Sequence, residues 1–313
     1  MPRVSIVMPV YNGSAFLNEA IDSMLSQSFR DFEFVIVDDG STDESPEIIE
    51  LYAHRDERVR AHTMVQNSGI VAALNAGVQA STGEYVARMD ADDISMPERL
   101  QHQVEYLDAS DVGAVGTNYI KFGQARMKTK RTQLPLSPDQ LRDTLPYTCC
   151  LGHPSVMFLR SAFDAVGGYD NAYAKGGAED YDLWLRMSLV YGLANIQEPL
   201  LRYRVHGSSL TAVAKTEDRY AYNSVCAVTN YFSRLYGLAG VSPPDGHEAI
   251  VLALSRALEA CQDAGQQRCL IRWTIRFARY CLTDVDMKAR AKACVTKYGT
   301  VKEKVKWRLY GIG

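Results

Sequence analysis

The feature that most constrains the fold is a regular alternation of strand and helix patterns over the first ninety residues. Continuous apolar runs at residues 4–10 and 34–37 are typical of strands buried on both faces, and β-rich runs also cover residues 60–64 and 85–89. Between them, helical patterns cover residues 14–25, 47–53 and 70–80. This alternation predicts an α/β domain, a mostly parallel, Rossmann-like sheet flanked by helices.

Each predicted strand ends in a polar turn. These turns are Tyr11-Asn12-Gly13, Asp38-Asp39-Gly40, Asn67-Ser68-Gly69 and residues 90–93. Because the carboxyl ends of parallel strands share one edge of a sheet, we expect these turns to converge on a binding site. The chain has neither the glycine pattern of dinucleotide-binding folds after its first strand nor a P-loop pattern, so we predict neither class.

The fourth turn carries three carboxylates within four residues, Asp90, Asp92 and Asp93. Such a cluster is stable mainly when a cation or a positively charged ligand lies among the acids. Carboxylate oxygens suit Mg²⁺ or Mn²⁺, and Mg²⁺ commonly combines one or two carboxylates with substrate phosphates. We therefore predict a metal-bridged diphosphate site. The alternatives are a solvated acidic loop, or Asp93 as the N-cap of a helix over residues 95–98.

The second half offers further candidates. Residues 153–158 and 199–201 are strand-like, and Glu179 and Asp180 lie in the first turn of a predicted helix. Acids at that position also complement the helix dipole, so the sequence alone leaves their role open. His206 follows the second of these strands, although an isolated histidine is more often structural. His153 is interpreted as a structural or acceptor-loop residue.

The last hundred residues differ in charge from the rest. Residues 215–313 carry 16 Lys and Arg against 9 Asp and Glu, a net of +7, whereas the whole chain has a net charge of −3. Helical composition covers residues 221–238, 246–264, 269–282 and 287–297, and Arg268, Arg272, Arg276 and Arg279 form one stripe. Residues 268–310 could contact an anionic membrane surface, or these helices could pack on the rest of the chain or on a second copy in a homo-oligomer. No recognition motif accompanies the charge, so we expect no nucleic-acid partner.

The remaining composition favours a cytoplasmic protein, peripheral at most on the inner face of the plasma membrane. No apolar run approaches the length of a membrane span, and nothing resembling a signal peptide precedes the first strand. Seven irregularly spaced cysteines are typical of reduced thiols.

Five motifs, taken in order, resemble the inverting family-2 glycosyltransferases with the GT-A fold, including those of bacterial cell-surface polysaccharide synthesis. They are Pro9-Val10-Tyr11-Asn12-Gly13, Gln27-Ser28-Phe29, Val37-Asp38-Asp39-Gly40-Ser41-Thr42-Asp43, Gln66-Asn67-Ser68-Gly69 and Arg88-Met89-Asp90-Ala91-Asp92-Asp93. The resemblance covers about residues 3–210. It implies a catalytic domain over residues 1–214, with a nucleotide-sugar half (1–95) and an acceptor half (96–214), followed by a helical extension (215–313).

The resemblance also implies residue roles. The nucleotide-sugar, usually a UDP-sugar, would be held by Pro9, Tyr11, Asn12, Asp39, Asn67, Arg88, Asp90, Ala91 and Arg204. In this scheme Pro9 and Tyr11 frame the base, Asp39 accepts from the uracil N–H, Asp90 lies near the ribose and Arg204 meets the diphosphate. Asp92 and His206 would ligate Mn²⁺ or Mg²⁺. Asp180, with Glu179 beside it, would be the general base that an acceptor hydroxyl needs.

These assignments predict transfer of one sugar, with inversion, from a UDP-sugar to a glycan or lipid-linked acceptor in O-antigen, capsule or exopolysaccharide synthesis. The Gln-x-x-Arg-Trp pattern of processive synthases is absent from the sequence, which favours a single addition. One alternative is a sugar-nucleotide nucleotidyltransferase, although that class carries a Gly-rich, basic loop where this chain has Tyr11-Asn12-Gly13-Ser14. The other is a non-catalytic binding or scaffolding protein on the same fold.

Overall fold

The computed structural model describes residues 1–123, 130–174, 176–207, 219–241, 246–280, 291–293 and 295–297. The chain divides into two compact units, one formed by Met1–Lys175 with Arg186–Ser209 and the other by Gly176–Leu185 with Leu210–Gly313. The second unit thus includes the start of the helix that carries Asp180. The predicted division of the chain after residue 214 stays a prediction.

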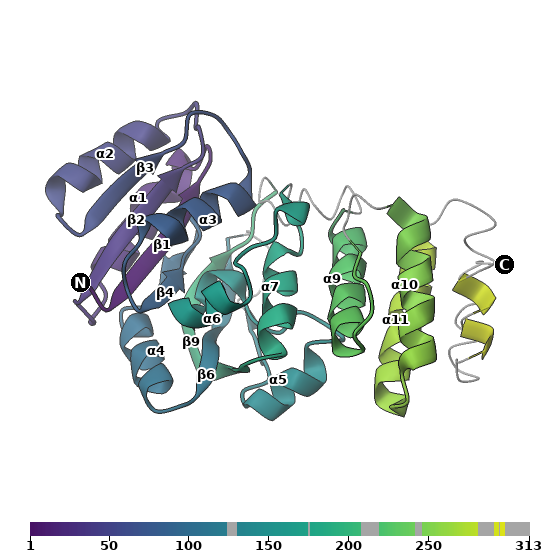
Figure 1. Cartoon of the computed structure of the whole chain (residues 1–313). Coiled ribbons are helices and arrows are strands. Elements are labelled where there is room, and N and C mark those ends of the chain that lie inside the picture. Colours follow the sequence, from purple (N-terminus) through teal and green to yellow (C-terminus); the bar gives the residue numbers. More distant parts are fainter. Residues whose placement is uncertain are drawn as a thin grey trace. The chain divides into compact units, whose positions relative to one another are not determined.

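The alternation predicted for the first ninety residues is confirmed. The elements are β1 (Val4–Val10), α1 (Ser14–Leu25), β2 (Phe32–Asp38), α2 (Ser45–Arg55), β3 (Val59–Thr63), α3 (Ile70–Ala80) and β4 (Tyr85–Arg88) (Figure 1). Strands β3, β2, β1 and β4 are neighbours in this order and all run parallel. Their carboxyl ends therefore lie at one edge, as the sequence predicted.

The acceptor half adds further strands to the same sheet, together with helices and two 3₁₀ turns. They are β5 (Ile94–Ser95), α4 (Arg99–Asp108), β6 (Val112–Phe122), β7 (Lys130–Arg131), α5 (Pro138–Thr144), the 3₁₀ turn η1 (His153–Ser155), β8 (Met157–Leu159), α6 (Arg160–Ala165), the 3₁₀ turn η2 (Asn171–Tyr173), α7 (Glu179–Ser188) and β9 (Gly192–Arg204). The sheet continues from β4 through β8, β6 and β9 to β5. Strand β8 is antiparallel to β4 and β6, whereas β6 and β9 are parallel over their length. The predicted mixed but mostly parallel α/β fold is confirmed.

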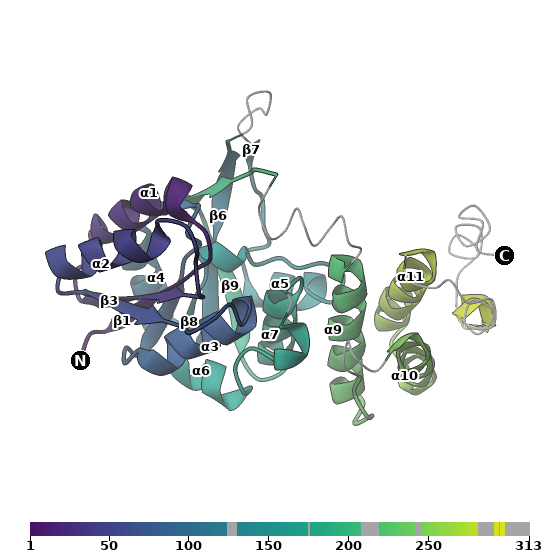
Figure 2. The ribbon, with the colours of Figure 1, turned by 90° about the horizontal axis from the view of Figure 1, so that it is seen from above.

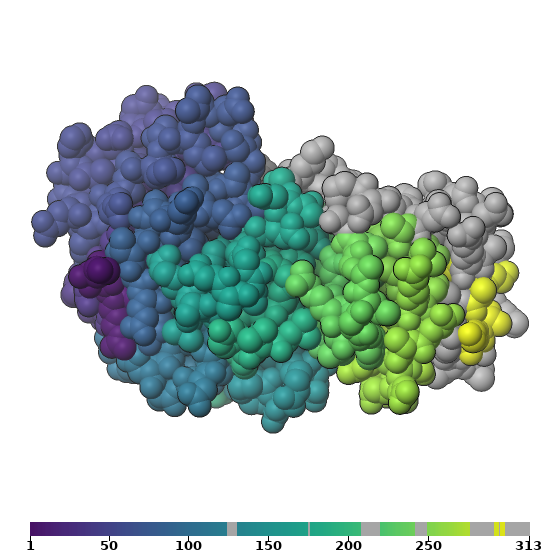
Figure 3. Space-filling model, viewed as in Figure 1, coloured from purple at the N-terminus to yellow at the C-terminus, as the bar shows by residue number. Residues whose placement is uncertain are grey.

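Helices cover both faces of this sheet. In Figure 2, α1, α2 and α4 lie on one side of the β1–β4 strands, while α3 and α6 lie on the other. The larger core cluster joins alternate residues of β1, such as Ile6 and Met8, to Ile21 of α1 and Leu100 of α4. On the opposite face, Val35 and Val37 pack with Ala73 of α3. Both strand faces are buried, which explains the continuous apolar runs. In the space-filling view of Figure 3, residues 1–95 (purple to blue) and residues 96–174 (blue to teal) lie against each other.

Two predicted strand boundaries were wrong, and so was one alternative given for Asp93. The strand-like residues 153–158 begin as η1, because Pro154 fixes a turn there, and only β8 is strand. Strand β9 extends to Arg204, so Arg202 and Arg204 belong to it rather than follow it. No helix covers residues 95–98. Ile94 and Ser95 form β5 against β9, and α4 begins at Arg99, so Asp93 is not an N-cap.

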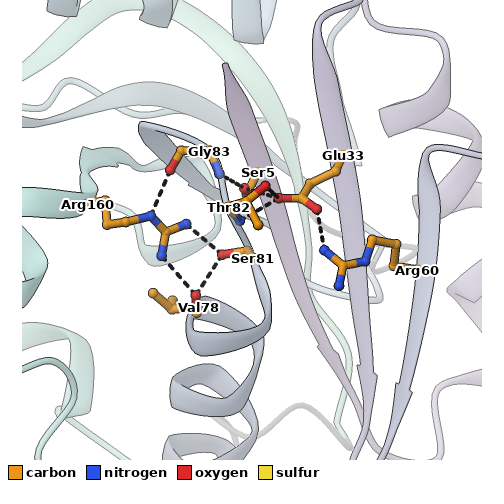
Figure 4. A network of polar contacts seen from close by, with 8 residues as sticks. All are labelled: Ser5, Glu33, Arg60, Val78, Ser81, Thr82, Gly83 and Arg160. Atoms are coloured by element: carbon orange, nitrogen blue, oxygen red, sulfur yellow. Dashed lines mark hydrogen bonds and ion pairs between the residues drawn. The ribbon is translucent and has the colours of Figure 1, made fainter. Parts of the chain in front are cut away.

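At the amino ends of the strands, one buried carboxylate organises a polar network (Figure 4). Glu33 of β2 accepts hydrogen bonds from the Ser5 hydroxyl (2.7 Å), from the backbone N–H and hydroxyl of Thr82 (2.6 and 2.8 Å) and from Arg60 (2.5 Å). Nearby, Arg160 donates to Gly83 and Val78 carbonyls and to the Ser81 hydroxyl. The network ties β1, β2 and β3 to the loop before β4.

The described part of the second unit is mostly helical. Its main helices are α9 (Arg219–Leu235), α10 (Gly246–Ala260) and α11 (Ala264–Tyr280), close to the predicted ranges, and residues 291–293 and 295–297 are also helical. On α11, Arg268 and Arg272 are exposed whereas Leu270, Ile271 and Trp273 are buried. Residues 301–310 lie outside the described residues. Among those described, no helix has both the length and the apolar character that a membrane span requires.

Candidate cation and nucleotide site

The acid loop, residues 90–93, connects β4 to β5 at the carboxyl edge of the sheet. One carboxylate oxygen from each of Asp90, Asp92 and Asp93 lies within 4.8 Å of the others. The structure therefore brings together the three acids that the sequence singled out. Asp93, which the sequence alternatively left as a helix N-cap, is one of these three.

Asp93 is the most enclosed of the three, with 1% of its surface exposed. Its Oδ1 accepts from the backbone N–H of Arg204 (2.7 Å), while its buried Oδ2 has no hydrogen-bond partner among the residues that the structure describes. Burial raises the pKa of Asp93 well above its ordinary value, and the charges of Asp90 and Asp92 raise it further. A buried, unpaired carboxylate oxygen beside two other acids is a strong indication of a cation-binding position.

Asp92 contacts His206, the residue predicted to share the metal with it. His206 Nε2 lies 2.7 Å from Asp92 Oδ2, and the imidazole ring packs on Phe16 of α1 with ring centroids 5.2 Å apart. Burial and the neighbouring Asp90 raise the pKa of Asp92, and the contact with His206 opposes that rise. The two side chains, separated by 114 residues in the chain, are thus adjacent in the structure.

Arg88 supplies a counter-charge beneath the loop. Its guanidinium is buried and forms an ion pair with Asp90 (2.5 Å). Burial by itself would lower the pKa of Arg88, but the Asp90 carboxylate raises it above its ordinary value. Arg88 therefore stays charged and holds Asp90 at the mouth of the cluster, where 28% of the Asp90 side chain is exposed.

Arg204 is fixed by several neighbours. Its Nε donates to the Asp92 carbonyl (2.7 Å), and its guanidinium pairs with Glu19 of α1. The same group lies over the rings of Phe16 and Phe122, 4.4 and 4.5 Å from their centroids. The sequence did not single out Glu19 or Phe16, because only the tertiary structure brings α1 against the end of β9. Contact between Arg204 and a diphosphate stays a prediction.

The turns after β1 and β2 interlock. Asn12 adopts φ 51°, its Oδ1 accepts from the Thr42 N–H (2.8 Å), and its own N–H donates to Ser41 Oγ (2.9 Å). Tyr11, predicted to frame the base, is half-exposed beside this turn. Two further residues were predicted to hold the nucleotide-sugar. Pro9 is buried in β1, and Ala91 is partly buried in the acid loop.

The turn after β2 is tied to the loop after β3. Asp39 is buried and accepts from the backbone N–H groups of Ser68 (2.7 Å) and Gly69 (2.9 Å). Gly40 has φ 71°, and a Cβ there would lie 2.7 Å from the backbone nitrogen of Asn67, so only glycine fits without a shift. Asp39 thus has a structural contact that the sequence did not predict, and its bond to a base stays a prediction. The exposed side chain of Asn67 lies at the same edge.

Glu179 and Asp180 lie in the first turn of α7, as predicted, and belong to the second compact unit. Glu179 is buried and Asp180 is partly exposed. The three residues before them, Gly176, Gly177 and Ala178, all have positive φ, with 91° at Ala178. A non-glycine residue in that region carries strain of about 1–3 kcal/mol, a feature that clusters at functional sites. The catalytic roles of Glu179 and Asp180 stay predictions.

His153 is buried and its Nε2 lies 2.8 Å from the Tyr169 hydroxyl. Burial lowers its pKa well below the ordinary value, and Arg88 lowers it further. A neutral, enclosed imidazole of this kind agrees with the structural interpretation of His153.

The residues at the edge fit a divalent cation. Three converging carboxylates and an adjacent imidazole provide the oxygen and nitrogen ligands that Mn²⁺ accepts, and the buried Asp93 Oδ2 has no hydrogen-bond partner among the described residues. An acidic cluster that served only as solvated surface would not bury one of its members.

Comparisons with known proteins identify relatives. Residues 5–167 match the family model described as Glycosyl transferase family 2. The O-antigen biosynthesis glycosyltransferase WbnJ of Escherichia coli is 30% identical over 248 residues, which cover 75% of this chain and 95% of WbnJ. The protein EpsE of Bacillus subtilis is 34% identical over 208 residues, covering 65% of this chain and 73% of EpsE.

Two solved structures share the fold at low identity. TarS 1–349 of S. aureus in complex with UDP-GlcNAc superposes with a TM-score of 0.62 at 16% identity, covering 98% of this chain and 92% of TarS 1–349. The mannosyltransferase PcManGT of Pyrobaculum calidifontis, in complex with GDP-Man and Mn²⁺, gives a TM-score of 0.55 at 17% identity, covering 99% of this chain and 84% of PcManGT.

Proposed function

Because this chain belongs to glycosyltransferase family 2, we propose that it transfers a single sugar from a UDP-sugar to a glycan or lipid-linked acceptor, with inversion. The similarity to an O-antigen biosynthesis glycosyltransferase supports a role in cell-surface polysaccharide synthesis, as O-antigen, capsule or exopolysaccharide. The family match also disfavours the nucleotidyltransferase alternative.

The observation that carries this proposal is the meeting of Asp90, Asp92 and Asp93 with His206 at the carboxyl edge of the sheet. Asp92, His206 and Asp93 would hold Mn²⁺ or Mg²⁺, with Asp90 beside them. When bound, such a cation would neutralise the charge of the leaving nucleoside diphosphate. A non-catalytic binding protein would not need a buried, unpaired carboxylate there.

The turns at the same edge would hold the nucleotide. Tyr11 offers a half-exposed ring next to the interlocked turns of Asn12 and Asp39. Each oxygen of Asp39 accepts one backbone hydrogen bond and retains capacity for another, so a base N–H could still bind there. The UDP-GlcNAc complex of TarS supports UDP as the nucleotide, and the GDP-Man complex of PcManGT makes GDP the competitor to test.

The chemistry proposed for the chain is a direct displacement. The acceptor hydroxyl oxygen attacks the anomeric carbon from the side opposite the leaving group, the carbon–oxygen bond to the diphosphate breaks, and the hydroxyl proton passes to Asp180. An alcohol is a weak nucleophile, so a positioned base typically contributes about 10²–10⁴-fold to the rate. The strained backbone at Ala178, directly before Glu179 and Asp180, supports a fixed position for this base.

For the helical second unit there are two alternatives, peripheral contact with an anionic membrane surface and packing of its helices. Exposed Arg268 and Arg272 on α11 are compatible with peripheral contact to an anionic membrane that carries a lipid-linked acceptor. Burial of Leu270, Ile271 and Trp273 beneath them supports packing of α11 within its own unit instead. Binding to vesicles with and without anionic lipid, compared with an Arg268→Ser/Arg272→Ser double variant, decides between the two.

The test of the donor site is a thermal-shift panel of UDP, GDP, CDP and dTDP, each with Mn²⁺, with Mg²⁺ and with EDTA. We expect UDP to raise the melting temperature only with a divalent cation. Stabilisation by GDP alone would change the donor, and no metal-dependent shift with any nucleotide would overturn the site.

The test of the base is Asp180→Asn, with Asp139→Asn as the matched control because the Asp139 side chain is exposed on α5. We expect Asp180→Asn to lower kcat by about 10²–10⁴-fold while the nucleotide-induced thermal shift is retained, and Asp139→Asn to leave both unchanged. Full turnover in Asp180→Asn would contradict the assignment of the base and leave the donor site standing.

A further inference from the structure

Arg99, the first residue of α4, is a charged side chain with no exposed surface. Its Nε donates to Gln103 Oε1 (3.1 Å), one terminal nitrogen donates to the Met89 sulfur (3.4 Å), and the other donates to the Arg88 carbonyl. These three acceptors are uncharged. Two of them belong to the residues that lead directly into the acid loop.

Gln103, one turn further along α4, is equally buried. Its Nε2 donates to the carbonyls of Val115 in β6 and Ser155 in η1, both at 2.9 Å. Arg99 and Gln103 together therefore connect the backbone at Arg88 to β6 and to the turn before β8. We refer to this pair as the α4 bracket.

We propose that Arg99 and Gln103 are positioning residues for the cation and diphosphate site. The α4 bracket fixes the backbone at Arg88 and Met89, so that Asp90, Asp92 and Asp93 enter the loop at the places where their carboxylates converge. This inference rests on the proposed function, since it assigns the bracket a role at the same site.

The cost of burying Arg99 supports a role beyond filling space. Removing a guanidinium from water is expensive unless its hydrogen bonds and charge are matched, and an apolar side chain would fill the core of α4 without that cost. Burial, together with the charge of Arg88, lowers the pKa of Arg99 to about 9, which leaves it protonated at neutral pH. Two buried cations, Arg88 and Arg99, thus lie near three carboxylates.

The charge of these groups also matters for the acids. The attraction between the Arg99 guanidinium and the carboxylates of Asp90 and Asp93 links the α4 bracket to the acid loop through charge as well as through hydrogen bonds.

The chain contains a matched control for a structural arginine. Arg160 also brackets backbone carbonyls, with bonds to Gly83 (2.8 Å) and Val78 (2.9 Å) and to the Ser81 hydroxyl (2.8 Å), as Figure 4 shows. It lies at the amino ends of the strands, at the end of the sheet opposite the acid loop. Arg160→Lys should therefore report the cost of weakening a partly buried arginine that brackets backbone carbonyls far from the acid loop.

The experiment compares wild type, Arg99→Lys, Gln103→Met and Arg160→Lys by thermal unfolding over a titration of MnCl₂, alone and with UDP. Arg99→Lys keeps the charge but not the fork of hydrogen bonds. Gln103→Met keeps the guanidinium of Arg99 and its bond to the Arg88 carbonyl, but removes the acceptor of Arg99 Nε and the links to Val115 and Ser155. Groups that orient metal ligands typically change metal affinity by about 10- to 100-fold. We expect both α4 variants to raise the Mn²⁺ concentration at half-maximal stabilisation by about that factor.

Arg160→Lys should lower the metal-free melting temperature and leave the Mn²⁺ midpoint unchanged. An unchanged midpoint in Arg99→Lys and Gln103→Met, or loss of the folded state in both, would assign the bracket a structural role only and overturn the inference. If wild type itself shows no Mn²⁺-dependent stabilisation, the proposed function fails first, and the inference fails with it. A normal wild-type titration with unshifted variants removes the inference alone.

Discussion

The amino and carboxyl ends of the same parallel strands treat buried carboxylates in opposite ways. At the amino end, Glu33 accepts four hydrogen bonds, and although burial alone would raise its pKa, the bonds from Ser5, Thr82 and Arg60 lower it to about 2. At the carboxyl end, burial and mutual repulsion raise the pKa values of Asp92 and Asp93. At the amino end the carboxylate is stabilised by the protein itself. At the carboxyl end the carboxylates repel one another, and a bound cation could relieve that repulsion.

Under the proposed function, this difference would let a single sheet support both folding and binding. The carboxylate of Glu33 has its hydrogen-bond partners within the protein, so we expect it to hold the strands together whether or not a ligand is bound. The acids of residues 90–93 are matched only in part, by Arg88 and His206. Sites that bind charged ligands commonly combine such perturbed groups with a rigid scaffold. In the proposed scheme, stabilisation of the sheet and cation binding belong to opposite ends of the strands.

The largest effect should follow Asp92→Asn. It removes a candidate ligand while conserving shape, so we expect turnover to fall by about 10²-fold or more, and the Mn²⁺-dependent thermal shift to disappear. The metal-free melting temperature should change little, because the lost contact with His206 is offset by weaker repulsion from Asp90. A much lower metal-free melting temperature in Asp92→Asn would contradict this prediction, because it would show that Asp92 stabilises the fold as Glu33 does.

Glu33→Gln should have the opposite profile. The lowered pKa, about 2 against an ordinary 4.5, corresponds to about 3 kcal/mol of stabilisation from the ionised form. We expect the free energy of unfolding in urea to fall by about 2–3 kcal/mol, whereas kcat per folded molecule and the Mn²⁺ midpoint stay as in wild type. Impaired metal binding in Glu33→Gln would show that the two strand ends are coupled.

The pH dependence of stability sharpens the same comparison. The folded-state pKa of Glu33 lies below its unfolded-state value, so the unfolded chain binds more protons between the two values. The contribution of Glu33 is therefore complete above about pH 4.5 and is lost as the pH falls towards about 2. Unfolding curves of wild type and Glu33→Gln in EDTA should differ most near neutral pH and converge in acid. A constant difference across this range would contradict the shift.

The smallest effect is expected for Asp93→Asn in EDTA. The side-chain oxygen can still accept from the Arg204 N–H, while one buried negative charge beside Asp90 and Asp92 is removed. Because the raised pKa makes the ionised Asp93 unfavourable in the folded state, the variant should be more stable by about 1 kcal/mol at neutral pH. Saturating Mn²⁺ should reverse the order and favour wild type. If Asp93→Asn were less stable than wild type in EDTA, the Asp93 carboxylate would be stabilised by contacts within the protein, and this prediction would be wrong.

Much of the edge was predictable from sequence because its signals are local. The apolar run of residues 4–10 and the acids that follow β4 identified the strands and their polar ends without any knowledge of packing. The same local reasoning was wrong where a competing contact prevailed. Residues 94–95 became β5 because β9 pairs with them, and no local pattern could reveal that partner.

Local sequence patterns were enough to predict the α/β alternation, the edge at which the turns converge and the acids that meet there, since strand and helix periods depend on neighbouring residues. Only the tertiary structure decided that Asp93 is buried against Arg204, that Glu19 and Phe16 hold the end of β9, and that Arg99 and Gln103 brace the loop from below. These contacts join residues far apart in the chain. Burial, and with it the cost of an unpaired charge, exists only once the sheet and its helices have closed around them.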